Sequence, residues 1–185
     1  MRIGLLKTPF CEGFMHLERR DMLAERLGVP GFSFEEMVRA CGMKRTPLGR
    51  EVDEYLISGP AARTPIPLAA RVVADRLGEP DVATGFVLSG YPYTAQCARD
   101  LDAVLSKLGA RLDRVLRFVV PVEVILQQWP VSVMSDKAGV RSEYRHHQHN
   151  ADSVFEHYGD RATEIDAVGD EDLIRARALA ALGLR

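Results

Sequence analysis

Short apolar segments alternate along the chain with longer segments in which hydrophobic residues recur every three or four positions. The first pattern is typical of buried strands, and the second is typical of helices with one apolar face. The strand-like segments span residues 3–6, 86–88, 115–120 and 163–165, with a fifth near 31–34. Because strands that alternate with helices form parallel sheets, the pattern predicts an α/β fold with helices flanking a parallel sheet.

Helical periodicity begins directly after the first strand. Met15, Met22, Leu23 and Leu27 share one face of a predicted helix that Gly28 ends, and we expect this stripe to pack in the core. Further helices are predicted at 33–40, 48–57, 68–77, 95–108, 123–129, 141–158 and 171–182. Residues 59–67 form a connector rich in helix breakers, and residues 129–139 are the best candidate for a flap.

Composition favours a single domain over residues 1–185, with 46% hydrophobic residues and no bias toward disorder. Lysine and arginine total 24 against 26 aspartates and glutamates, and neither sign forms a long block. We therefore expect no nucleic acid partner and no anionic membrane partner. No run of eighteen apolar residues occurs, so no membrane-spanning helix is expected either.

The cysteines indicate a reducing environment. Cys11, Cys41 and Cys97 are odd in number and lack the C-x-x-C spacing of a zinc site or the density of a disulfide scaffold. The chain starts with one arginine and a short apolar strand instead of the apolar core of a signal peptide. These features predict a cytoplasmic protein.

One histidine cluster, formed by His146, His147 and His149, lies in a predicted helix. His146 and His149 have the i, i+3 spacing that can hold a metal on one helical face. No third ligand of evident geometry follows in the sequence, and structural zinc sites normally need four ligands. We therefore predict no metal site and interpret the cluster as a solvated helical face.

Several strings give the chain a resemblance to the adenylate kinase family over nearly its whole length. The most specific is TGFVLSGYPYTAQCARDLD at 84–102, and AERLGVP at 24–30, EEMVRA at 35–40 and IDAVGDEDL at 165–173 follow the family order. The resemblance implies a five-stranded parallel sheet of the P-loop nucleotide-kinase type. It also implies a helical insert at 33–65 like the one that binds nucleoside monophosphates in the family, and a shortened lid at 129–139.

The turn after the first strand departs from the family pattern. A P-loop presents G-x-x-x-x-G-K-[ST] to nucleotide phosphates, and the chain has no such motif. The degenerate P-loop consists of Lys7, Thr8, Pro9, Phe10, Cys11, Glu12 and Gly13. Glu12 lies near a helix start, where its carboxylate either fills the anion site from within or simply faces solvent.

Other positions that match the family site have also changed. Ser89 replaces an acidic residue after the third strand, Tyr93 replaces an arginine, and Cys97 replaces a glutamine that reads adenine. Gln128 and Glu143 stand near two further arginine positions, and Met134 and Ser135 near an Asp-Asp pair. Arg39 matches the arginine that holds the AMP phosphate. The ligand-binding candidates are Arg39, Ser89, Gly90, Tyr91, Tyr93 and Cys97; the two tyrosines either stack on a ligand or fill the former substrate crevice.

These losses predict that ordinary ATP:AMP phosphotransfer is absent, because one transition-state arginine is worth roughly 10³–10⁵ in rate. We expect no cofactor, with Mg-ATP not bound in the usual way, and no assignable catalytic residue. The leading hypothesis is a protein that binds a nucleoside monophosphate or other small anion, or a protein partner. The alternatives are an enzyme of altered chemistry on a nucleotide or phosphorylated metabolite, and a weak kinase that uses Lys7, Lys44, Arg45 and Arg63.

Overall fold

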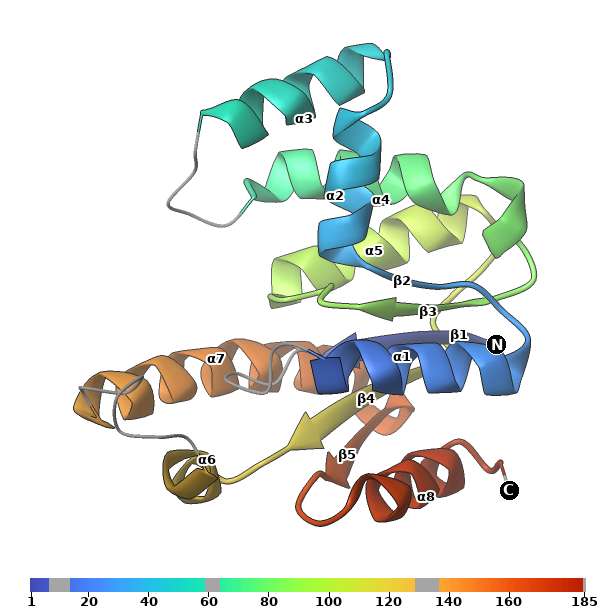
Figure 1. Ribbon diagram of the computed structural model, residues 1–185. Coiled ribbons are helices and arrows are strands. Elements are labelled where there is room, and N and C mark those ends of the chain that lie inside the picture. The colour runs from blue at the N-terminus through green and yellow to red at the C-terminus, as the bar shows by residue number, and fades with distance from the viewer. Residues whose placement is uncertain (7–13, 59–63, 129–136, 185) are drawn as a thin grey trace.

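The protein folds into a parallel β-sheet with helices on both faces (Figure 1). The computed structural model describes residues 1–6, 14–58, 64–128 and 137–184. The strands are β1 (Arg2–Leu6), β2 (Gly31–Ser33), β3 (Phe86–Ser89), β4 (Arg114–Val119) and β5 (Ala162–Asp166). They lie in the order β2-β3-β1-β4-β5, and every neighbouring pair is parallel. The predicted five-stranded parallel α/β fold is therefore confirmed.

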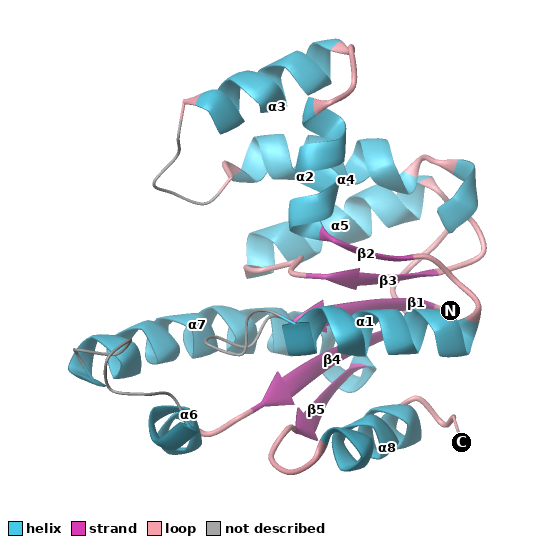
Figure 2. Cartoon of the chain, in the orientation of Figure 1, coloured by secondary structure: helices cyan, strands magenta, loops and turns pink. Residues whose placement is uncertain are grey.

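Helices connect successive strands, as Figure 2 shows. They are α1 (Phe14–Leu27), α2 (Phe34–Gly42), α3 (Pro47–Ile57), α4 (Ile66–Leu77), α5 (Ala95–Lys107), α6 (Val122–Gln128), α7 (Lys137–Tyr158) and α8 (Glu171–Ala181). Two short 3₁₀ turns, η1 (Pro80–Val82) and η2 (Gly159–Arg161), precede β3 and β5. In Figure 1 the α2–α3 pair projects from the sheet as an insert between β2 and α4.

Two hydrophobic clusters cover the two faces of the sheet, because successive side chains of a strand point to opposite sides. On one face Ile3 and Leu5 pack with Leu23 of α1 and Ile174 of α8. The other face joins β3 to α4 and α5 through Phe86, Leu88, Val72, Val73 and Leu101. These strand residues are almost completely buried, as expected for a parallel sheet covered on both sides.

Side-chain caps fix the directions of the two insert helices. Ser33 Oγ accepts a hydrogen bond from Glu36 N (3.1 Å), and Glu36 Oε2 accepts one from Ser33 N (2.6 Å), which forms a capping box at the start of α2. Arg20 of α1 donates to the same Glu36 oxygen (2.5 Å). Thr46 Oγ1 accepts from Gly49 N (2.9 Å) and caps α3. The end of the sheet and the insert are therefore joined by local polar contacts.

Some predicted boundaries differ from the observed ones. The helix expected at 141–158 begins at Lys137. Residues 137–139, the end of the segment predicted as a flap, are therefore helical, and residues 129–136 lie outside the described residues. The helix expected at 68–77 begins at Ile66, because Pro67 is compatible with a first helical turn. Among the described residues, no helix combines the length and apolarity needed to cross a bilayer. The division into insert and lid stays a prediction.

Candidate ligand-binding site

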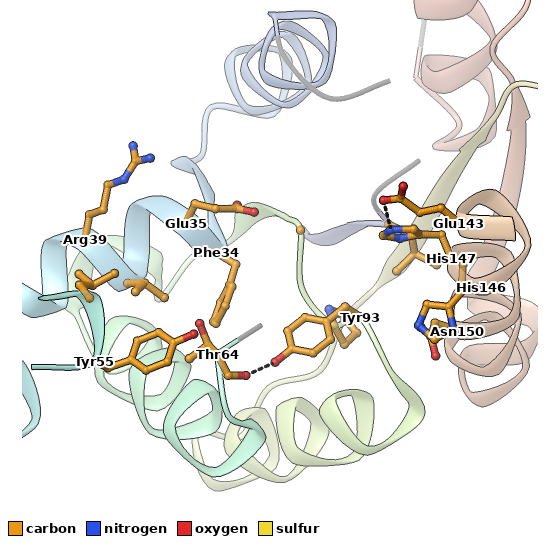
Figure 3. Close-up of a pocket in the computed structure, with 16 residues that line it drawn as sticks. Phe34, Glu35, Arg39, Tyr55, Thr64, Tyr93, Glu143, His146, His147 and Asn150 are labelled. Carbon is orange, nitrogen blue, oxygen red and sulfur yellow. Dashed lines mark hydrogen bonds and ion pairs between the residues drawn. The ribbon is translucent and has the colours of Figure 1, made fainter. Parts of the chain in front are cut away.

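A cavity of about 700 Å³ lies between the α2–α3 insert and α7, at the carboxyl ends of the central strands (Figure 3). Open parallel α/β sheets bind ligands at this edge. The lining residues come from β1, the insert, the turn after β3, and α7. They are Leu6, Phe34, Glu35, Val38, Arg39, Tyr55, Leu56, Thr64, Gly90, Pro92, Tyr93, Glu143, His146, His147, Asn150 and Ala151.

The floor of the cavity is the turn that follows β3. Gly90 has φ +76, a conformation that favours glycine, and its N–H donates to Leu5 O (3.2 Å) in the neighbouring strand. A Cβ at Gly90 would lie 3.2 Å from Glu35 Oε2, so the Glu35 carboxylate lies directly against this turn. The structure therefore brings an acidic group to the strand end, a feature that the sequence pattern did not predict.

An aromatic cluster forms one wall of the cavity. The Phe34 ring stacks on Tyr91 with centroids 5.3 Å apart, and Tyr93 meets both rings edge-on at 5.9 and 5.7 Å. The Tyr93 hydroxyl donates to Thr64 O (2.9 Å), which ties the turn after β3 to the segment that leads into α4. Tyr93 and Phe34 line the cavity, whereas Tyr91 is completely buried beneath them.

The predicted ligand residues divide into two groups. Arg39, Gly90 and Tyr93 line the cavity. Ser89, Tyr91 and Cys97 are completely buried and lie outside its lining. Ser89 Oγ and the Tyr91 hydroxyl have no hydrogen-bond partner within the described ranges, and burial raises the pKa of Tyr91 well above its usual range. Cys97 N donates to Thr94 Oγ1 (3.2 Å) in the cap of α5. The second group therefore supports the wall from beneath.

The α7 wall was missed by the sequence interpretation. Glu143, His146, His147 and Asn150 line the cavity from this helix, although the histidines were interpreted as a solvated face. His147 Nε2 lies 3.8 Å from Glu143 Oε1, and Asn150 Nδ2 lies 3.3 Å from His146 Nε2. The spacing i, i+3, i+4, i+7 of these four residues is the signal that would have revealed a shared face. Across the described residues no group of three or more histidine, cysteine or acidic side chains is arranged for a metal.

Other basic residues considered from the sequence lie elsewhere. Lys44 Nζ pairs with Asp75 and Glu79 at 2.7 Å each, and these hydrogen bonds raise the pKa of Lys44. Arg45 is exposed outside the cavity lining. Within the described ranges, Arg39 is thus the one lysine or arginine that lines the cavity. The following candidates lie outside the described residues: Lys7, Thr8, Pro9, Phe10, Cys11, Glu12, Gly13, Arg63, Met134 and Ser135.

Comparison of the whole chain with known proteins shows its relatives. The chain is 36% identical over 185 residues to the adenylate kinase of Nocardia farcinica, with 99% of each chain covered. It belongs to the adenylate kinase family. Identity is also 36% to the adenylate kinase of Mycobacterium tuberculosis and 35% to that of Corynebacterium glutamicum, again over 99% of each chain. A scan of family models found no match.

Membership of the adenylate kinase family confirms the resemblance and corrects one expectation. The sequence led us to expect no cofactor, with Mg-ATP not bound in the usual way, and this was wrong. Adenylate kinases use Mg-ATP, and the similarity to them extends along the whole chain. The error came from treating a missing motif as missing binding. A nucleotide site also depends on the shape of the sheet edge, which many residues outside one motif determine.

Proposed function

We propose that the chain is a nucleotide-binding member of the adenylate kinase family that holds a nucleoside monophosphate in the cavity. We further propose that its transfer of a phosphoryl group from ATP to AMP is lost or much slower than in its relatives. The observation behind the second part is the charge of the cavity. Its described lining residues include one positively charged side chain, Arg39, and two negatively charged ones, Glu35 and Glu143.

Binding of a monophosphate is supported by the size and surface of the cavity. Its volume of about 700 Å³ lies within the range typical of small-molecule sites. Phe34, Tyr55 and Tyr93 offer aromatic surface to a base, and Arg39 offers a guanidinium to a phosphate. All four residues come from the insert or from the turn after β3, so one side of the cavity supplies both kinds of contact.

Loss of efficient transfer is supported by the shortage of positive charge. Phosphoryl transfer depends on cations placed around the migrating group, and each such arginine is worth roughly 10³–10⁵ in rate. The chain lacks a G-x-x-x-x-G-K-[ST] motif, and Tyr93 stands at a position that matches an arginine of the family. The Tyr93 hydroxyl is directed to Thr64 O, so it supplies no charge to a phosphate.

The described lining residues also include carboxylates that fit magnesium. Magnesium is bound in proteins by one or two carboxylates together with waters and phosphate oxygens. Glu35 and Glu143 are the carboxylates among the described lining residues; they lie on opposite sides of the cavity (Figure 3), so Glu35, which lies against the turn after β3, is the one that would hold the ion at the strand ends, together with phosphate oxygens and waters. Magnesium supplies charge neutralisation to the nucleotide phosphates when it is bound. The remaining lining residues bind and orient the nucleotide and exclude water.

Calorimetric titration with AMP tests the binding part of the proposal. Arg39→Ala removes a charge-assisted contact worth about 1.5–3 kcal/mol, so AMP affinity should fall roughly 10- to 150-fold. Arg50→Ala is the matched control, because Arg50 is an exposed residue of the same insert outside the cavity lining. Equal AMP affinity in the two variants would place the phosphate elsewhere.

Transfer is tested by following radiolabel from the γ-phosphate of Mg-ATP into ADP in the presence of AMP. Nucleotide and protein kinases typically turn over about 1–100 times per second, and we expect a rate at least about a thousandfold lower. The Arg39→Ala protein, purified in the same way, reveals activity from a contaminating kinase. Turnover in the ordinary kinase range that Arg39→Ala abolishes would overturn this part of the proposal.

A further inference from the structure

We propose that Tyr93 selects the base of the bound nucleotide. Its hydroxyl donates a hydrogen bond to Thr64 O, and its oxygen accepts one from an amino group at the edge of the base. This inference rests on the proposed function, because it names the class of base that the cavity prefers. A nucleotide whose base has an exocyclic amine at this edge, as adenine does, is favoured over one that lacks it. Arg39 keeps the phosphate, so Tyr93 acts at the other end of the ligand.

The aromatic rings of the cavity wall form a stack with a third ring turned across it. The rings of Phe34 and Tyr91 are stacked, with 24° between their planes, and Tyr91 is completely buried. Because Tyr91 covers one face of Phe34 and Phe34 lines the cavity, the other face of Phe34 is the one that a base can stack on. The plane of Tyr93 is inclined at 61° to Phe34 and at 84° to Tyr91. A base on Phe34 therefore extends the stack and turns its edge toward Tyr93.

The hydroxyl of Tyr93 is held in one direction. It donates to Thr64 O at 2.9 Å, and Figure 3 shows it directed toward Thr64, on the side of the cavity that also holds Phe34 and Tyr55. A tyrosine hydroxyl has one proton, which otherwise rotates to suit its partner. Because a backbone carbonyl holds this proton, the Tyr93 oxygen offers lone pairs to the cavity. Such an oxygen accepts from an N–H group of a base and disfavours a base edge that has none.

The position of Arg39 is compatible with a base on Phe34. The two residues lie on α2 and are separated by five positions, or about 7.5 Å along the helix axis, a gap that a ribose can bridge between base and phosphate. The acidic groups of the described lining lie elsewhere. Glu35 lies against the turn after β3, and Glu143 lies on α7 at the far side of the cavity (Figure 3). The edge of the base is thus left to Tyr93.

Calorimetric titration with two ligands tests this role. Purine riboside 5′-monophosphate differs from AMP only by the absence of the exocyclic amine, so it removes the proposed hydrogen bond and keeps the phosphate and the ring. We expect the unmodified protein to bind it about two- to twelvefold more weakly than AMP, the effect of one neutral hydrogen bond. Tyr93→Phe keeps the aromatic ring and removes the acceptor, so this variant should bind the two ligands with nearly equal affinity.

The ratio of the two affinities separates recognition of the base from a structural role. If the hydrogen bond to Thr64 O only held the wall together, Tyr93→Phe would weaken both ligands equally and leave their ratio unchanged. Tyr144→Phe is the matched control. The Tyr144 hydroxyl also donates to a backbone carbonyl, Val120 O, at 2.9 Å, but Tyr144 is not among the described residues that line the cavity. This variant should keep the ratio of the unmodified protein.

The outcomes distinguish this inference from the proposed function. Equal affinity of the unmodified protein for AMP and purine riboside 5′-monophosphate would overturn the inference, and this measurement does not depend on the folding of a variant. A preference for AMP that survives in Tyr93→Phe would also overturn it, while binding of a nucleoside monophosphate stands. If the unmodified protein binds neither ligand, both proposals are wrong.

Discussion

Glu36 joins the capping box of α2 to a buried arginine of α1, and its replacement should loosen the helix that presents Arg39 to the cavity. Glu36 Oε2 accepts hydrogen bonds from Ser33 N (2.6 Å) and Arg20 Nη1 (2.5 Å). Burial of Glu36 raises its pKa, but the hydrogen bond from Ser33 N and the charge of Arg20 outweigh this effect and lower the pKa overall. Glu36→Gln keeps the shape of the side chain and removes its charge.

The expected loss follows from the surroundings of the pair. Hydrogen bonds to charged groups are worth about 1.5–3 kcal/mol, and Arg20 is only 6% exposed. Since the Glu36 side chain is 47% exposed, solvent screening reduces this figure. We expect Glu36→Gln to lower the free energy of unfolding by about 1–2 kcal/mol, or the melting temperature by roughly 2–8 °C in a domain of this size.

Urea denaturation at several pH values checks this prediction. Because the pKa of Glu36 is lower in the folded state, its contribution is full above the ordinary carboxyl range and is lost as the pH falls through the folded value. The difference between the unmodified protein and Glu36→Gln should therefore be largest near pH 7 and shrink below about pH 4. Glu25→Gln, at an exposed position of α1, is the control. Equal stability at pH 7, or a difference that stays constant down to about pH 3, would refute the reasoning.

Two further substitutions test the packing around the insert and beneath the cavity. Gly49→Ala places a Cβ against Lys44 O and 2.7 Å from Cys41 O, which are both rigid backbone atoms. Thermal unfolding should show a loss of about 1–3 kcal/mol in the free energy of unfolding. Gly78→Ala is the control, because its Cβ meets Ala74 O at 3.4 Å, and it should cost less than about 1 kcal/mol. Tyr91→Phe removes a completely buried hydroxyl that has no hydrogen-bond partner among the described residues. The free energy of unfolding should therefore change by less than about 0.5 kcal/mol or increase. A loss above about 1 kcal/mol in urea denaturation would show that the hydroxyl does make a hydrogen bond.

Local sequence patterns predicted much of the fold because they act over a few residues. The apolar segments became β1, β3, β4 and β5, and the capping box in Ser33–Glu36 started α2 one residue after the serine. Proline in the first turn of α4 was the main error of this kind, because it was interpreted as a breaker. Such signals depend on the backbone conformation of a few neighbouring residues, so they predict where an element begins or ends without the rest of the chain.

Three of the residues predicted from the family strings, Arg39, Gly90 and Tyr93, line the cavity, and their binding of a ligand stays a prediction. Ser89, Tyr91 and Cys97 come from the same strings but point into the core, because residues of a strand end and of the following helix alternate between the edge and the interior. Glu143, His146 and His147 were missed as a wall, since a polar helix face looks the same whether it meets solvent or a cavity.

The sequence by itself determined the order of strands and helices, the helix caps and the number of charges available to the chain. Only the tertiary structure decided which of those charges meet. Glu35 and His147 are more than a hundred residues apart in the chain, and the packing of the insert and α7 at the same edge of the sheet brings both to one cavity. Caps and periodicity depend on neighbours in sequence, whereas the charge of a cavity depends on long-range packing that no local pattern contains.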